Sequence, residues 1–216
     1  MTHLFRCHNI GRLMTAPTAA AMKAGEVLSV GAKTLVREIA AQDIMGIDFV
    51  VSSKEMEKGI VCEGESIDLL NRVRGLSLSK NTERRSNGLI SGECDLFDAT
   101  RREGFDVKTS WSVKTFPAFE IDAVDSIYEW QARSYMWLWG VERWTVAYCL
   151  VDTPPELIGY EPPSLHVVSH VPEHMRLTTW TIERDADKEA LIAAKVAAAR
   201  AYYAEVLAEF ERTHGA

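Results

Sequence analysis

The chain has 216 residues and a mass of 24.2 kDa, which is enough for one domain with a sizeable core. Its 47% hydrophobic and 25% charged residues exclude a disordered chain, a collagen-like chain and a coiled-coil rod. The net charge of −7 argues mildly against a nucleic-acid partner, but the stretch from Arg72 to Lys114 carries nine basic and six acidic side chains. That stretch fits a locally basic groove and, equally well, a solvated loop of mixed charge.

No run of the sequence approaches the roughly 18 apolar residues that a membrane-spanning helix needs, and the first residues lack the apolar segment of a signal peptide. The four cysteines, Cys7, Cys62, Cys94 and Cys149, are scattered without the close pairs typical of zinc or iron–sulfur sites. We therefore expect a cytoplasmic protein with reduced, mostly buried thiols and no membrane contact, located in the host cytoplasm if a phage encodes it.

Hydrophobic periodicity and turn residues predict helices, two strands, a helix, two more strands and a last helix. The predicted helices cover residues 33–45, 54–73 and 122–139, and the predicted strands cover 89–99, 104–112, 144–151 and 176–182. A long alanine-rich helix ends the chain, with Asp185 or Asp187 near its N-cap. A polar turn around residues 101–103 makes the first two strands a hairpin. The order indicates a mixed α/β or α+β domain around one sheet.

The informative residues begin in the second strand of this hairpin. Strand side chains alternate between two faces, so Asp106 and Lys108 point to one side while Phe105 and Val107 point to the other. Asp95 lies on the first strand, and hairpin pairing would bring it close to Asp106 and Lys108. Taken alone, such a group is more often a surface salt bridge on a half-exposed sheet than a catalytic site.

The helix predicted over residues 54–73 supplies another carboxylate. At about 100° per residue this helix has one apolar stripe, formed by Met56, Ile60, Ile67 and Leu70. Glu63 falls inside the stripe, whereas Glu65 faces away from it and is expected in solvent. A buried carboxylate needs a partner because an isolated buried charge is costly. A metal ion would serve as that partner, and so would an arginine in the core.

Glu63, Asp95, Asp106 and Lys108 together supply the groups that metal-assisted phosphodiester hydrolysis needs. Hard oxygen ligands suit Mg²⁺ or Mn²⁺, and such an ion polarises a phosphoryl oxygen and lowers the pKa of its bound water. A nearby ammonium orients that water and stabilises the charge of the transition state. Acidic residues that hold a metal, which in turn meets phosphate, reconcile an acidic chain with a nucleic-acid substrate.

The sequence resembles the PD-(D/E)XK nuclease superfamily, most closely its phage-type exonucleases, the lambda exonuclease and YqaJ-like group. The matching pieces are, in order, Gly59 with Glu63, Gly92 with Asp95, Asp106 with Lys108, and Gln131 with Tyr135. They span residues 54–151, and the strand and long helix in 176–212 also look like the group. The resemblance implies one nuclease domain over residues 1–216, with a restriction-endonuclease-like αβββαβ core in which helices flank a mixed central sheet.

The resemblance also implies a ligand set. Asp95, Asp106 and the backbone carbonyl of Val107 would bind Mg²⁺ or Mn²⁺, and Glu63 would complete the shell or hold a second metal. Lys108 would orient the attacking water.

Gln131 and Tyr135 lie four residues apart on one helical face, and the family places such a pair near the DNA or the site. A polar helix edge beside the core explains Tyr135 about as well. The sequence departs from the family at Cys94, where a proline usually precedes the first aspartate, and Glu93 adds a carboxylate as a rim residue or an auxiliary ligand.

Further residues are candidates for DNA contacts. In the phage exonucleases an N-terminal arginine and a small polar residue help to hold a terminal phosphate, and the candidates here are Arg6 and Asn9. Candidate phosphate contacts on the face of Lys108 are Arg84, Arg85, Arg101 and Arg102, for which a solvated loop far from DNA is an equally good explanation. Trp111 follows Lys108 closely and is a candidate stacking platform, although most tryptophans are simply core.

These patterns predict a Mg²⁺-dependent DNA exonuclease that processes duplex ends for phage recombination. An endonuclease or resolvase uses the same core, and a catalytically silent DNA-binding protein would keep the fold, so the sequence leaves both alternatives open. The resemblance permits a ring-shaped homotrimer around DNA and a single-strand annealing recombinase as a partner.

Overall fold

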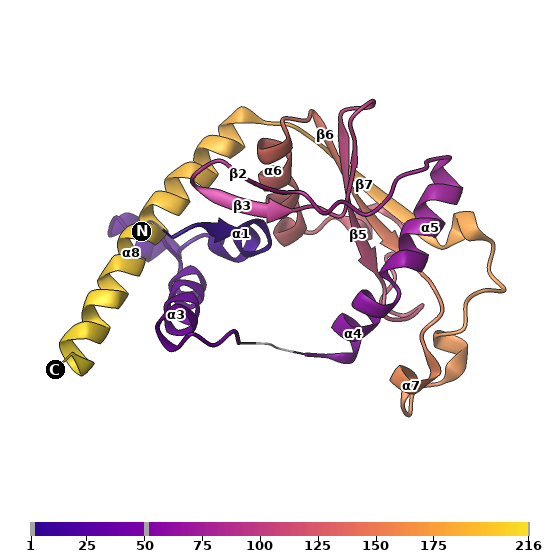
Figure 1. Cartoon of the computed structure of the whole chain (residues 1–216), viewed down its shortest axis with the longest axis horizontal. Coiled ribbons are helices and arrows are strands. Elements are labelled where there is room, and N and C mark those ends of the chain that lie inside the picture. Colours follow the sequence, from indigo (N-terminus) through magenta and orange to yellow (C-terminus); the bar gives the residue numbers. More distant parts are fainter. Residues whose placement is uncertain (1–2, 50–51, 216) are drawn as a thin grey trace.

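The computed structural model describes residues 3–49 and 52–215 (Figure 1). Its helices and strands are, in chain order, β1 (Phe5–Arg6), α1 (Cys7–Leu13), α2 (Ala19–Lys23), α3 (Val30–Met45), α4 (Lys54–Val61), α5 (Glu63–Arg74), β2 (Arg84–Ser86), β3 (Ile90–Glu93), β4 (Leu96–Asp98), β5 (Glu103–Thr109), η1 (Glu120–Ala123), α6 (Ser126–Trp139), β6 (Arg143–Cys149), α7 (Pro155–Ile158), η2 (Pro163–Leu165), η3 (Glu173–Met175), β7 (Leu177–Glu183) and α8 (Ala186–His214). Figure 1 shows α3 and α8 on one side of the molecule and α4 and α5 on the other, with the strands between them.

A four-stranded mixed sheet with the order β4-β5-β6-β7 forms the centre. Strands β5 and β6 run parallel, and the other two neighbouring pairs are antiparallel. Along β6, Trp144 and Val146 face a core that they share with α1, α3, α6 and α8, while Ala147 and Cys149 face a second core against α5. Helices therefore flank a mixed sheet on both faces, and the predicted fold class is confirmed.

A second sheet, with the order β1-β3-β2, was not predicted. The prediction of one strand over 89–99 is wrong, because β3 belongs to this sheet and β4 to the central one. The register that pairs Leu96 with Phe105 would place Cys94 opposite Val107. Instead, the Val107 N–H donates to Oδ2 of Asp95 at 2.7 Å, and the chain leaves the hairpin at that point.

The prediction of one continuous helix over 54–73 is also wrong, because the chain breaks at Cys62 into α4 and α5. The expected apolar stripe therefore does not cross the break. Ile67 of α5 is buried as expected, but Met56 and Ile60 of α4 are 52% and 77% exposed. Lys58, which the sequence did not single out, is the buried side chain of α4.

The other predicted helices and strands lie close to their ranges, whereas β1, α1, α2, β2 and α7 have no predicted counterpart. Asp185 caps α8, since its side chain accepts hydrogen bonds from the N–H groups of Asp187 and Lys188. Gly92 allows α1 and α6 to meet at β3, because a Cβ there would lie 2.6 Å from Sγ of Cys7 and 2.7 Å from the ring of Tyr135. Within the described ranges, no helix combines the length and the apolar character that crossing a membrane requires.

Candidate active site

A cavity of about 660 Å³ lies at the carboxyl end of β5, between α4 and α5 on one side and α6 on the other. It brings together four residues that the sequence singled out, Glu63, Asp95, Asp106 and Lys108. Val107 and Gln131, also among the predicted site residues, line the same cavity.

Asp106 and Lys108 form the centre of the site. They leave β5 on the same face, as strand alternation requires, and Lys108 Nζ lies 2.7 Å from Oδ2 of the buried Asp106 carboxylate. Burial opposes the charge on Lys108, but the facing Asp106 carboxylate outweighs it and raises the pKa of Lys108. The same ammonium lies 4.3 Å from the centre of the Tyr128 ring. Lys108 is therefore held as a cation beside the carboxylate.

Asp95 sits at the break between β3 and β4 and reaches the site through its side chain. Burial and the negative charge of Asp106 raise the pKa of Asp95 to about 7, although the Val107 N–H stabilises the ionised form. Two carboxylates that repel each other in a partly buried cavity favour the binding of a cation between them.

Glu63 begins α5 at the rim of the cavity, where its side chain is 28% exposed. It is ion-paired with Lys80, and this contact raises the pKa of Lys80. In the described ranges no three His, Cys, Asp or Glu side chains are grouped closely enough to form a metal ligand set. The structure therefore puts Glu63 in the same cavity as Asp95 and Asp106 but against a lysine.

Gln131 of α6 orients the Asp106 carboxylate. Its Nε2 lies 3.4 Å from Oδ1 of Asp106 and 3.5 Å from the hydroxyl oxygen of Tyr135. Tyr135 is 6% exposed and its ring stacks on Trp144 at 5.2 Å, so it belongs mainly to the core. Burial raises the pKa of the Tyr135 hydroxyl, which keeps it neutral.

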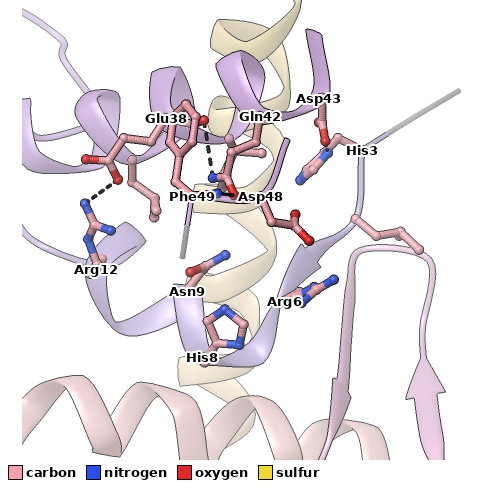
Figure 2. Close-up of a pocket in the computed structure, with 13 residues that line it drawn as sticks. His3, Arg6, His8, Asn9, Arg12, Glu38, Gln42, Asp43, Asp48 and Phe49 are labelled. Atoms are coloured by element: carbon pink, nitrogen blue, oxygen red, sulfur yellow. Dashed lines mark hydrogen bonds and ion pairs between the residues drawn. The ribbon is translucent and has the colours of Figure 1, made fainter. Parts of the chain in front are cut away.

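Arg6 and Asn9 line a different cavity, of about 620 Å³, between β1 and α1 on one side and α3 on the other (Figure 2). Figure 2 shows Arg6, His8 and Asn9 facing Asp48 and the other side chains carried by α3 and the residues after it. Burial lowers the pKa of His8, and the positive charges of Arg6, Lys108 and Arg84 lower it further.

The four candidate arginines do not lie together. Arg84 pairs with Glu93 at 3.4 Å on the second sheet, and Arg85 pairs with Glu83 and lies over the Trp139 ring.

Arg101 and Arg102 occupy the turn before β5, where they pair with Asp98 and Glu142. Lys108 lies six residues after Arg102 along an extended strand, a separation of about 20 Å. The structure thus leaves these two arginines at the opposite end of β5 from the site.

Trp111 is 7% exposed, and its Nε1 donates to Glu161 Oε1 at 2.9 Å while its ring meets His166 edge-on. It lines the cavity but is packed into the protein, so little of its face is open to a base. Glu93 is engaged by Arg84 at the edge of the second sheet.

Solved structures of exonucleases share this architecture. A phage-related exonuclease from Haemophilus somnus 129PT superposes with a TM-score of 0.90 at 33% sequence identity, over 97% of each chain. The chain belongs to the phage-related exonucleases. No family model matches the sequence, and no curated protein matches it either.

The alkaline exonuclease LHK-Exo from Laribacter hongkongensis has a similar fold but is a more distant match to this member of the phage-related exonucleases. The TM-score is 0.66 at 15% identity, over 97% of this chain and 91% of that one. A second structure of that enzyme, in complex with dAMP, gives a TM-score of 0.64 at 16% identity and the same coverage. At such identities the likeness concerns the fold alone.

Sequence reasoning missed three side chains at or beside the candidate active-site cavity, namely Lys58, Lys80 and Tyr128. Tyr128 lies three residues before Gln131 on the same face of α6, so helical spacing was a usable signal. No sequence pattern pointed to Lys80 or Lys58, because their partners are 17 and more than 50 residues away.

The donor set suits a divalent cation. In the described ranges, Oδ2 of Asp106 is buried without a hydrogen bond of regular geometry, and its close contact is the Lys108 ammonium. Mg²⁺ is commonly held by one or two carboxylates together with waters and substrate phosphates. The two carboxylates of Asp95 and Asp106 and the neighbouring Val107 backbone therefore fit Mg²⁺ or Mn²⁺.

Proposed function

We propose that the protein is a Mg²⁺- or Mn²⁺-dependent exonuclease that hydrolyses phosphodiester bonds at the ends of duplex DNA. The observation that carries the proposal is the meeting of Asp95, Asp106 and Lys108 in one cavity of a chain that belongs to the phage-related exonucleases. A role in phage recombination, with a single-strand annealing recombinase and a ring-shaped homotrimer, rests on that family membership.

Asp95, Asp106 and the Val107 carbonyl would hold the cation, with Glu63 as an additional oxygen donor. The bound cation would polarise the scissile phosphate and lower the pKa of a bound water. Glu63 first has to leave Lys80, and the ammonium of Lys80 then becomes available to a phosphate of the substrate.

The other side chains keep this constellation in place. Gln131 fixes the orientation of the Asp106 carboxylate through Oδ1, and the Val107 N–H fixes Asp95 through Oδ2. Lys108 places a positive charge beside both the attacking water and the phosphate oxygens, where it stabilises the developing negative charge. Tyr128 covers the ammonium with its ring and keeps it pointed into the cavity.

The experiment compares linear duplex DNA with covalently closed circular DNA, each with Mg²⁺ and with EDTA. The proposal expects mononucleotide release from the linear duplex only, and only with the metal. Nicking of the closed circle would replace the exonuclease with an endonuclease. Degradation in EDTA would contradict the metal mechanism, and tight DNA binding without cleavage in Mg²⁺ or Mn²⁺ would select a silent DNA-binding protein.

A further inference from the structure

Lys58 is a fully enclosed lysine next to the cavity, with an exposed fraction of 0%. Its Nζ donates to the backbone carbonyls of Ser110, Trp111 and Val151 at 2.8, 2.9 and 2.9 Å. An ammonium has three donors, so all of its hydrogen-bonding capacity is used. Burial lowers the pKa of Lys58 to about 8, since no carboxylate among the described residues forms an ion pair with it.

The three acceptors lie just beyond the carboxyl ends of the parallel strands β5 and β6. The Trp111 carbonyl also accepts from the hydroxyl of Thr153 at 3.1 Å, and that hydroxyl contacts Nδ1 of the buried His166 at 3.0 Å. Lys58 therefore inserts into a buried polar cluster that closes the end of the sheet.

Helix α4 depends on this one side chain. Lys58 is the buried residue of α4, whereas Ile60 and Val61 are exposed and Met56 is half exposed. The side of α4 that carries Glu55, Met56, Gly59 and Ile60 nevertheless forms one wall of the candidate active-site cavity. No apolar side chain within α4 is buried, so the Lys58 hydrogen bonds, together with the buried Cys62 at the C-terminal end of the helix, set the position of α4 over the site.

We propose that Lys58 is a positioning residue that fixes α4 as the wall against which the cavity holds the DNA strand. The proposal rests on the proposed nuclease function for its substrate. It predicts that Lys58 governs how well DNA is held, while the chemistry stays with the residues of β5.

Lys58→Met tests this, because methionine fills the space but donates no hydrogen bond. Lys195→Met is the matched control, since Lys195 donates to the carbonyls of Thr15 and Val27 at 3.1 and 2.7 Å and lines no part of this cavity. Hydrogen exchange of the full chain should become at least tenfold faster in α4 of Lys58→Met and unchanged there in Lys195→Met. The KM for linear duplex should rise about tenfold with kcat within threefold, and Mn²⁺ affinity should stay within twofold.

Unchanged exchange in α4, or faster exchange with an unchanged KM, would overturn the proposal, and so would a fall in kcat alone. If Lys58→Met does not fold, the wild type decides. Hydrogen exchange in α4 should slow when the wild type binds duplex DNA in Ca²⁺. No change in α4 would contradict the proposal that α4 is the wall that holds the DNA strand. If the wild type binds DNA without cleaving it, the proposed function fails, while exchange in Lys58→Met still decides whether Lys58 holds α4 and exchange with DNA still decides whether α4 is the wall.

Discussion

The two walls of the candidate active site are built in different ways. The wall formed by β5 is paired with β6 along its whole length and with β4 over residues 103–105, and its side chains alternate as a regular strand dictates. The opposite wall, α4, has a single buried side chain and joins α5 through a break at Cys62. Asp106 and Lys108, the centre of the proposed metal site, lie on the β5 wall, whereas the wall proposed to hold the DNA strand is the lightly attached one.

The largest expected effect comes from the rigid wall. Asp106→Asn and Lys108→Met should each lower single-turnover cleavage by about 10²–10⁴-fold, because they remove a ligand and a charge that stabilises the transition state. Glu65→Gln is the control and should be nearly silent, since Glu65 is exposed on α5. Full activity in Asp106→Asn would remove β5 from the mechanism.

The raised pKa of Asp95 predicts a pH dependence of the stability of the protein. The folded, metal-free protein holds a proton on Asp95 up to about pH 7, whereas the unfolded chain releases it near the ordinary aspartate pKa of 3.8. The free energy of unfolding of the wild type should therefore fall, relative to Asp95→Asn, by up to ~1.4 kcal/mol per pH unit as pH rises from 4 to 7. Denaturation by urea at several pH values measures this fall in the free energy of unfolding, and saturating Mn²⁺ should abolish the fall. A pH-independent difference would contradict the raised pKa of Asp95, which burial and then the charge of Asp106 cause.

A smaller effect is expected where the two walls meet. Lys80→Met removes the partner of Glu63 and frees that carboxylate for the cation. We expect Mn²⁺ to bind two- to tenfold more tightly by calorimetry, in line with loss of a competing ion pair worth ~1 kcal/mol. Lys114→Met, on the loop after β5, is the control. Weaker Mn²⁺ binding in Lys80→Met would mean that Lys80 supports the site rather than competes for Glu63.

The smallest effect concerns the arginines. Arg84, like Arg6 and Lys108, is one of the positive charges that lower the pKa of His8, so Arg84→Ala should flatten the log–log salt dependence of DNA binding by about one unit. The double variant Arg101→Ala/Arg102→Ala should leave both affinity and slope unchanged, because these residues lie at the far end of β5. Filter binding in Ca²⁺ at several salt concentrations measures both. The reverse pattern would move the DNA path to the turn before β5.

The sequence predicted the residues of the β5 wall better than those of the α4 wall. Strand alternation placed Asp106 and Lys108 on one face, and the ordered motif placed Asp95 and Gln131 with them, since both signals are local. The helical phase that joined Glu63 to Met56 and Ile60 failed, because it assumed an unbroken helix across Cys62. The roles of Lys58 and Lys80 could not be predicted from the sequence, since a lysine gives no periodic signal. The carbonyls of Ser110 and Val151 come close to Lys58 only after the sheet has formed.

The central claim is that the carboxylates around β5 hold the catalytic metal. Anomalous scattering from crystals soaked in Mn²⁺ tests it most directly. The account predicts a peak about 2.1 Å from carboxylate oxygens of both Asp95 and Asp106, with the Val107 carbonyl as a further ligand. A sole Mn²⁺ peak elsewhere in the chain, with cleavage intact in Asp106→Asn, would contradict it.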